Sequence, residues 1–429
     1  MSGDGGEREH IVDCRYVPVS MTNFIEKIKE EKNTLLIILG AMGLHLTAGQ
    51  VYAWSVFTKP LIATFGWSLM QVSMIFSLAI FALGMTAAFA GKQIEQLGPK
   101  KSAIIGTILF LAGFIGSFYA LSIGSLPLLY LCYSGLFGCS TGVFYLAPCK
   151  TVIAAMPNHK GMAGGLCILA FGASASIASI LYTYLMSFLP IATVFLVSAG
   201  LYAILLAISL FAFTIAQTTI TEVRTNLRGL TFSDAIKTKT YYKLWFLLGT
   251  SIFVFIGMIS VCAPMAMEML NIDAVAAAGI TAIVAIFNGA GRIFWSTLSD
   301  YLGTKRTYTL IYTLYFIMFG ILMYIPGSFA FKLAVFTLAS LYGGGFSVIP
   351  AYIADTFGLK EHSRIHGTIL SSWAIASITS VPFLSWIHMT FGAYVYAIPV
   401  YMVLIGIMGI VSLTTVREYA PQTVKIDKH

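Results

Sequence analysis

Long apolar segments are the feature that most constrains what this chain can fold into. Stretches of about 20 residues, the length that an α-helix needs to cross the hydrocarbon core of a bilayer, alternate with short polar connections. Inside a membrane the backbone polar groups find no water, so such segments are stable there as helices. The sequence predicts an all-α integral membrane protein with twelve spans, at approximately 34–57, 69–90, 102–122, 126–148, 162–186, 190–216, 243–265, 274–298, 308–326, 331–354, 366–388 and 393–416.

The composition supports this class. Hydrophobic residues make up 58% of the 429 residues and charged residues only 10%, against about 25% charged residues in an average soluble domain. The first 33 residues are polar and of mixed charge, so we expect no removable signal peptide. The six cysteines include no C-x-x-C pair, and we expect small buried packing residues rather than disulfides or a zinc site.

The net charge of +8 could indicate a nucleic-acid partner, but the positions of the charges argue against one. Lysine and arginine gather in every second connection, and the exceptions are Lys59, Lys332 and Arg292. The positive-inside rule then places both termini in the cytoplasm. We therefore expect a multi-pass protein of the cell membrane, with the lipid bilayer and not a nucleic acid as its large partner.

Two sequence matches indicate a duplicated unit. "GKQIEQLGPKK" (91–101) is repeated 205 residues later as "STLSDYLGTKR" (296–306), and "GVFYLAP", ending at Pro148, corresponds to "GGFSVIP", ending at Pro350. Nearly equal offsets predict two pseudo-symmetric six-helix bundles. The expected units are an N-terminal tail (1–33), the first bundle (34–216), a linker (217–242), the second bundle (243–416) and a C-terminal tail (417–429).

The duplicated loop combines a glycine for a tight turn, an acid near a helix end and cations that face anionic headgroups. Such a loop can hold helices in one arrangement and release them in another. The alternative is a tight turn that carries only positive-inside charge. The residues predicted to act in this way are Gly91, Glu95, Gly98, Lys101, Asp300, Gly303 and Arg306.

These loops and spans resemble the major facilitator superfamily from Thr34 to Arg417. More narrowly, "GQVYAWSVFTKPL", "FYLAPCKTVIAAMPNHKGMAGGL", "NGAGRIFWSTLSDYLG" and "YGGGFSVIPAYIADTFG" resemble the oxalate:formate antiporter family, which is related to the monocarboxylate transporters. The resemblance implies a secondary transporter whose two bundles rock about a central site. We expect no enzyme activity, no cofactor and a functional monomer.

Arg292 lies inside an apolar run, where a charge costs about 2.5 to 3.5 kcal/mol on insertion scales. Helical spacing puts it on one stripe with Thr281, Asn288 and Trp295. A guanidinium binds a carboxylate through two parallel hydrogen bonds, and Asn288 can donate to the same ligand. The resemblance likewise makes this arginine the ligand of the substrate anion. Alternatively, Arg292 reaches the headgroups, or holds the end of its span against a carbonyl or Asp300.

Aromatic residues are candidates for the rest of the site. Tyr342 and Phe346 are one turn apart, as in monocarboxylate transporters, and the resemblance adds a tryptophan in span 11 and tyrosines such as Tyr133 and Tyr145 in span 4. For each, packing or lipid contact is the alternative. The predicted lining residues are Tyr52, Tyr133, Tyr342, Phe346 and Trp373.

One departure from the family concerns charge. The antiporter of this family has a lysine three residues after the tryptophan of span 11, where this chain has Ala376. A single cation favours a monoanion such as formate, acetate, lactate or pyruvate. The alternatives are an oxalate/formate-type dicarboxylate antiporter, and a membrane sensor that does not transport.

Energy coupling is the least constrained property. None of the 17 acidic residues lies near the middle of a span, so the usual carboxylate relay is missing. His45 is the central candidate for proton coupling, and a packing role is its alternative. Exchange, facilitated movement and proton symport stay open, with the first two favoured. We interpret Glu361–His366 as a cytoplasmic loop in contact with headgroups rather than as a metal site.

Overall fold

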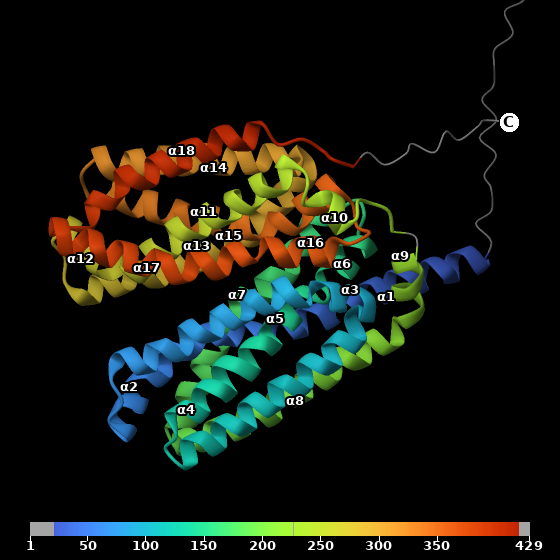
Figure 1. Cartoon of the computed structure of the whole chain (residues 1–429), viewed down its shortest axis with the longest axis horizontal. Helices are drawn as coiled ribbons and strands as arrows, with labels where there is room; N and C mark the ends of the chain where they lie inside the picture. The colour runs from blue at the N-terminus through green and yellow to red at the C-terminus, as the bar shows by residue number, and fades with distance from the viewer. Residues whose placement is uncertain (1–20, 226, 420–429) are drawn as a thin grey trace, which may run out of the picture.

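The computed structural model describes residues 21–225 and 227–419. Figure 1 shows two helical bundles that lie closest together at one end of the molecule and diverge towards the other. The described chain begins and ends at the closed end, which we call the terminal side. The opposite end, where α2 (Ser55–Phe65) and α12 (Cys262–Leu270) lie, is the far side.

The first bundle is continuous from the start of the described chain. Its elements are α1 (Met21–Gly49), η1 (Gln50–Trp54), α2, α3 (Leu69–Ser122), α4 (Leu126–Leu129), the π-helical η2 (Tyr130–Phe137), α5 (Gly138–Leu146), α6 (Cys149–Ala155), α7 (Lys160–Met186) and α8 (Ile191–Ile215).

The second bundle follows two short helices, α9 (Gln217–Thr225) and α10 (Phe232–Ala235). Its elements are α11 (Lys239–Ser260), α12, α13 (Ala274–Leu302), α14 (Thr304–Tyr324), α15 (Ser328–Phe357), α16 (His362–Ile369), α17 (Ser371–Phe391), η3 (Tyr394–Ala397) and α18 (Ile398–Leu413).

Among the described residues, 11 helical segments are long and apolar enough to cross a membrane. One of them, in α3, covers two predicted spans, because the helix is interrupted at Gly98 and the chain then reverses direction into a second helical segment. The twelve-span all-α prediction is therefore confirmed. The limits predicted for the tails, bundles and linker stay predictions; α1 begins at Met21, inside the predicted tail, and α9 and α10 lie inside the predicted linker.

The two copies of the loop turn in the same way. Gly98 has φ 79° and Gly303 has φ 85°, in the region of backbone space that favours glycine. Gly98 is followed by Pro99, whose fixed φ suits the first position of a helix. Both turns join antiparallel helices with almost no loop.

Each bundle has an aromatic core and an apolar outer surface. In the second bundle, Tyr308, Tyr312 and Tyr401 are buried, whereas Ile407 and Ile410 of α18 are 50% and 67% exposed. A stripe of exposed aliphatic side chains on a helix of this length is the surface expected to face lipid.

Candidate functional site

The two bundles touch through two helix crossings on the terminal side. α7 packs against α13 and α15, and α3 packs against α16 and α17. Both crossings bring backbones together: a Cβ at Gly161 would lie 2.0 Å from the carbonyl oxygen of Ser296, and one at Gly367 would lie 2.0 Å from that of Ala87. These contacts close the terminal side.

The loop acid of each bundle caps a helix of the other bundle. Asp300 accepts hydrogen bonds from the amides of Gly161 (2.7 Å) and Met162 (2.9 Å) at the start of α7. Glu95 accepts one from the amide of Ser363 (3.0 Å) at the start of α16. Helix N-termini carry unsatisfied N–H groups and a partial positive charge, so both acids stabilise the closed arrangement.

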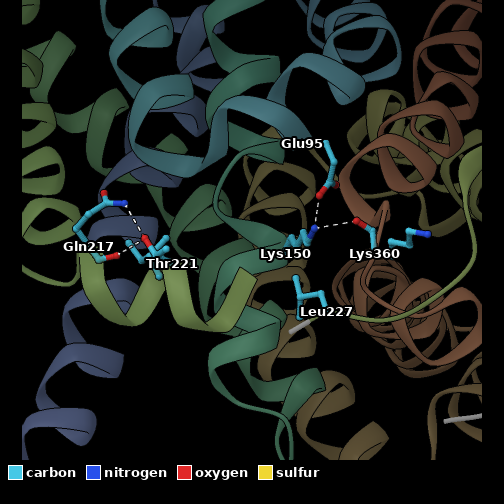
Figure 2. Close-up of a pocket in the computed structure, with 7 residues that line it drawn as sticks. Glu95, Lys150, Gln217, Thr221, Leu227 and Lys360 are labelled. Atoms are coloured by element: carbon cyan, nitrogen blue, oxygen red, sulfur yellow. Dashed lines mark hydrogen bonds and ion pairs between the residues drawn. The ribbon is translucent and has the colours of Figure 1, made fainter. Parts of the chain in front are cut away.

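Ion pairs surround these caps. Lys150 pairs with Glu95 and donates to the carbonyl oxygen of Lys360 at 3.0 Å, as Figure 2 shows. Lys160 pairs with Asp355 at 2.8 Å. Glu95, Lys150 and Lys360 also line a cavity of about 350 Å³ beside α9. Of the predicted loop residues, Glu95 and Asp300 therefore join the two bundles, whereas Lys101 and Arg306 are exposed. That the loops release the helices in another arrangement stays a prediction.

Arg292 reaches from one bundle to the other. Its side chain leaves α13, is 7% exposed, and donates from Nη1 to the carbonyl oxygen of Ile168 on α7 at 2.7 Å. A Cβ at Gly172 would lie 2.9 Å from the guanidinium carbon, so α7 leaves space for this group. The Arg292 Nε has no hydrogen-bond partner among the described residues. The carbonyl alternative is thus realised, although the carbonyl belongs to the opposite bundle.

Asn288 lies one turn before Arg292, against α15. A Cβ at Gly343 would come within 2.8 Å of its Oδ1, and this oxygen has no hydrogen-bond partner in the described part of the chain. A buried amide without a partner is rare and needs an explanation. As an acceptor, this oxygen can take a hydrogen bond from a donor but cannot bind a carboxylate, which could use only the amide nitrogen.

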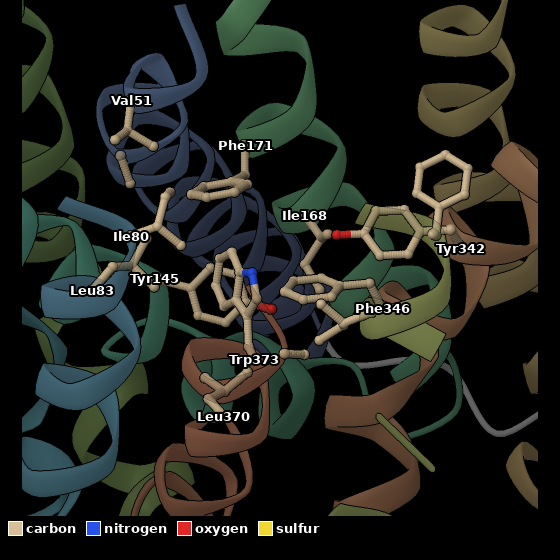
Figure 3. Packing of buried hydrophobic residues seen from close by; sticks show 14 of the residues in the cluster. Val51, Ile80, Leu83, Tyr145, Ile168, Phe171, Tyr342, Phe346, Leu370 and Trp373 are labelled. Carbon is tan, nitrogen blue, oxygen red and sulfur yellow. The ribbon is translucent and has the colours of Figure 1, made fainter. Parts of the chain in front are cut away.

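Aromatic rings from both bundles meet near Ile168, whose carbonyl oxygen accepts the hydrogen bond from Arg292 (Figure 3). Tyr145 of α5 is central: its ring centroid lies 5.5 Å from Phe171, 5.7 Å from Phe346 and 5.8 Å from Trp373. The rings of Phe346 and Trp373 are 4.9 Å apart, with their planes nearly perpendicular. Contacts of this kind favour edge-to-face geometry.

Other predicted residues extend this cluster. Tyr342 lies 6.2 Å from Phe346, and Tyr52 lies 5.8 Å from Phe171. The hydroxyls of Tyr52 and Tyr342 lie within the electrostatic influence of Arg292, as does the ring of His45. The structure therefore gathers the predicted residues Arg292, Tyr52, Tyr342, Phe346, Trp373 and His45 in one region.

Tyr133 does not join them. Its ring lies 4.4 Å from Trp54 and 4.8 Å from Phe137, in the core of the first bundle. The span 4 tyrosine in the cluster is Tyr145. The internal repeat carries a signal for this position, because aligning "GVFYLAP" with "GGFSVIP" puts Tyr145 next to the counterpart of Phe346.

The interpretation of Glu361–His366 as a headgroup loop is wrong for its histidines. His362 and His366 are fully buried, and Nε2 of His362 hydrogen-bonds the carbonyl oxygen of Pro350 at 2.9 Å. Only Arg364 matches that interpretation in part, since its guanidinium lies 4.3 Å from the ring of Phe232 near the surface. α16 begins at His362, earlier than the apolar run predicts. Close contacts with α3 at Gly91 and Gly367 hold this helix between the two bundles.

Comparison with known proteins agrees with this architecture. The family profile of the Major Facilitator Superfamily matches residues 38–348 and 245–428. A relative described as an uncharacterized MFS-type transporter, YhjX of Escherichia coli, is 25% identical over 354 residues, which cover 81% of this chain and 87% of that protein. The oxalate:formate antiporter of Oxalobacter formigenes is 22% identical over 348 residues, covering 80% and 82%.

Solved structures show the same fold. The transporter FucP in its outward conformation superposes with a TM-score of 0.70 at 13% identity, covering 90% of this chain and 99% of that one. A bacterial homologue of ferroportin in the outward-facing state gives 0.69 at 13% identity, covering 89% and 98%. The chain belongs to the Major Facilitator Superfamily and is a multi-pass membrane transporter.

Proposed function

We propose that this transporter carries a small monocarboxylate, such as formate, acetate, lactate or pyruvate. The observation that carries the proposal is Arg292: a buried guanidinium that spans the two bundles, keeps Nε without a partner among the described residues, and lies beside aromatic rings. A buried charge of this kind is costly unless it has a task. A carboxylate can accept two parallel hydrogen bonds from the guanidinium, one of them from the unpartnered Nε.

The count of charges supports a monoanion. The position that holds a second cation in the family's antiporter is Ala376, which is 4% exposed on α17. A dianion would leave one carboxylate without a charged partner in a medium of low dielectric constant. The likeness to the oxalate:formate antiporter favours the second candidate, dicarboxylate exchange, and competition by oxalate decides between the two.

Alternating access is the proposed mechanism. The closed terminal side is the state described above, and opening requires Asp300 and Glu95 to leave the helices that they cap. By the positive-inside rule the terminal side faces the cytoplasm of the cell membrane. Both crossings form within one chain, so the proposal needs only a monomer.

A thermal-shift screen of the purified protein tests the substrate class. Formate, acetate, pyruvate, lactate and oxalate are compared, since a ligand that binds only the folded state raises the apparent melting temperature. A shift with a monocarboxylate in wild type, and none in Arg292→Gln, supports the proposal. Counterflow of the same labelled acid in proteoliposomes then separates a transporter from a sensor. A larger shift with oxalate than with every monoanion would reject the monocarboxylate assignment.

A further inference from the structure

A line of buried titratable groups runs from the aromatic cluster towards the terminal side. The ring centroids of His45 and Tyr145 are 5.4 Å apart, those of Tyr145 and His366 are 6.1 Å apart, and those of His366 and His362 are 5.4 Å apart. His45 comes from α1 and Tyr145 from α5, whereas both other histidines come from α16. The line therefore crosses from one bundle to the other.

Hydrogen bonds fix the protonation pattern at both ends of the line. A carbonyl oxygen can only accept, so Nδ1 of His45, which bonds the Ala41 carbonyl at 2.9 Å, carries a hydrogen, and Nε2 keeps its lone pair. By the same argument, Nε2 of His362 donates to the Pro350 carbonyl at 2.9 Å, and Nδ1 is basic. Each terminal histidine thus has one anchored nitrogen and one nitrogen that can accept a proton.

The groups between and at these ends lack partners within the described chain. His45 Nε2, His362 Nδ1, the Tyr145 hydroxyl and both nitrogens of His366 make no hydrogen bond there. The main-chain carbonyl of Tyr145 also lies near the His45 ring without forming one. Buried polar atoms are normally paired, and a contiguous set of unpaired ones is unusual. Ring spacings of this size are within reach of a single bridging water or a rotation of the rings.

Two ion pairs lie near His362, at the terminal end of this line of residues. His362 experiences the field of Lys150 from α6 and Lys160 from α7, which are themselves paired with Glu95 and Asp355. His366 faces His362 and His45, and His45 faces Arg292. His362 has no solvent exposure in the closed arrangement. A proton on His362 therefore has no direct contact with terminal-side water in the closed arrangement.

We propose that His45, Tyr145, His366 and His362 form a gated relay that carries one proton with each carboxylate. The proton binds Nε2 of His45 while the anion binds Arg292. When the terminal side opens, the proton passes through Tyr145 and His366 to Nδ1 of His362 and leaves to water as the anion departs. The net event is the movement of one neutral acid, after which the Tyr145 hydroxyl and the His366 ring reorient to their starting forms. The relay rests on the proposed function and selects symport from the modes left open.

Proteoliposomes with an internal pH indicator test the relay. The probe is the labelled acid among formate, acetate, pyruvate and lactate that gives the greatest wild-type counterflow over protein-free liposomes. With one proton per monoanion, an inward gradient of one pH unit drives about tenfold accumulation. We expect His366→Gln and His362→Gln to lose this accumulation, while counterflow between preloaded and external substrate, which needs no net proton movement, persists.

His388→Gln is the matched control. His388 lies on α17 at the far side, and its side chain is 41% exposed. The His388→Gln variant should therefore accumulate substrate like wild type. Counterflow also reports that each variant is folded. If the wild-type protein exchanges substrate without any proton movement, the relay is wrong and the proposed function stands. The same holds if both α16 variants show normal proton-driven accumulation. Absence of counterflow with every acid overturns the proposed function, and the relay with it.

Discussion

The two crossings between the bundles have the same shape and different chemistry. In each, a loop acid caps a helix of the opposite bundle and backbones meet at a glycine. The loop offset of 205 residues makes Ala87 the counterpart of Arg292. On the opposing helices, the spacing of the two repeat prolines makes Gly164 the counterpart of His366. One crossing therefore holds a permanent charge and the other holds titratable rings.

This difference teaches how a duplicated unit becomes specialised. The groups that hold the bundles together are kept in both copies, as expected if both crossings open and close together. The groups that we propose to bind the substrate occur once, since a single guanidinium suits a single carboxylate. Variants at each crossing can test whether both crossings close in the same way and whether only one of them binds the substrate anion.

Arg292→Lys is expected to have the largest effect. Lysine keeps the charge but loses the planar fork and the reach to Ile168, so counterflow of the labelled acid should fall about 100-fold. Arg228→Lys, at an exposed position between α9 and α10, is the control and should behave as wild type. Near-normal counterflow in Arg292→Lys would remove the chemical distinction between the crossings.

Gly161→Ala and Gly367→Ala should come next and should act alike. Each new methyl group meets a carbonyl oxygen of the opposite bundle, and overpacking of this kind costs about 1 to 3 kcal/mol. The closed terminal side should lose population, as seen in distances between spin labels on α3 and α13. Gly200→Ala, where a Cβ meets nothing within 4 Å, should leave the distances unchanged. An effect at one crossing only would show that the two do not close together.

Ala376→Lys should add a positive charge to the crossing of α3 with α16 and α17. A second cation near Trp373 gives a dianion a second partner, so oxalate should compete about tenfold better against the labelled monocarboxylate. Thr379→Ser, at an exposed position further along α17, is the control. Wild type that already prefers oxalate would contradict the charge count.

Neutralising the Asp300 cap should have the smallest effect. Asp300→Asn weakens one helix cap by about 1 kcal/mol, which is roughly a fivefold change in population. Glu95→Gln should shift the same spin-label distances further, because Glu95 also pairs with the buried Lys150. Equal shifts would mean that this ion pair adds nothing to closure.

The fold could be predicted from the sequence because its signals are local. Apolar length identifies the spans, and the loop glycines identify tight turns that take positive φ at Gly98 and Gly303. Arg292 stands out for a similar reason, as a charge within a long apolar run.

The remaining site residues depend on which way a helix faces, and an apolar helix gives no such signal. Tyr133 and Tyr145 lie on the same span, yet only the packing of α5 against the opposite bundle brings Tyr145 to Arg292. The sequence suggests a loop at His366, because Arg364 lies two residues before it. The close approach of Gly367 to the Ala87 carbonyl shows that this turn lies between the two bundles.

The hydrogen bond from Arg292 to the Ile168 carbonyl has a consequence for discrimination between solutes. The guanidinium is already served by a neutral acceptor, so an incoming solute must compete with the main chain of α7. A carboxylate wins that competition because its charge-assisted bonds are about twice as strong as those of a neutral oxygen. An amide or alcohol that displaces the Ile168 carbonyl only exchanges one neutral acceptor for another. Under the proposed function, the contact that closes the terminal side would thus also disfavour uncharged analogues such as lactamide.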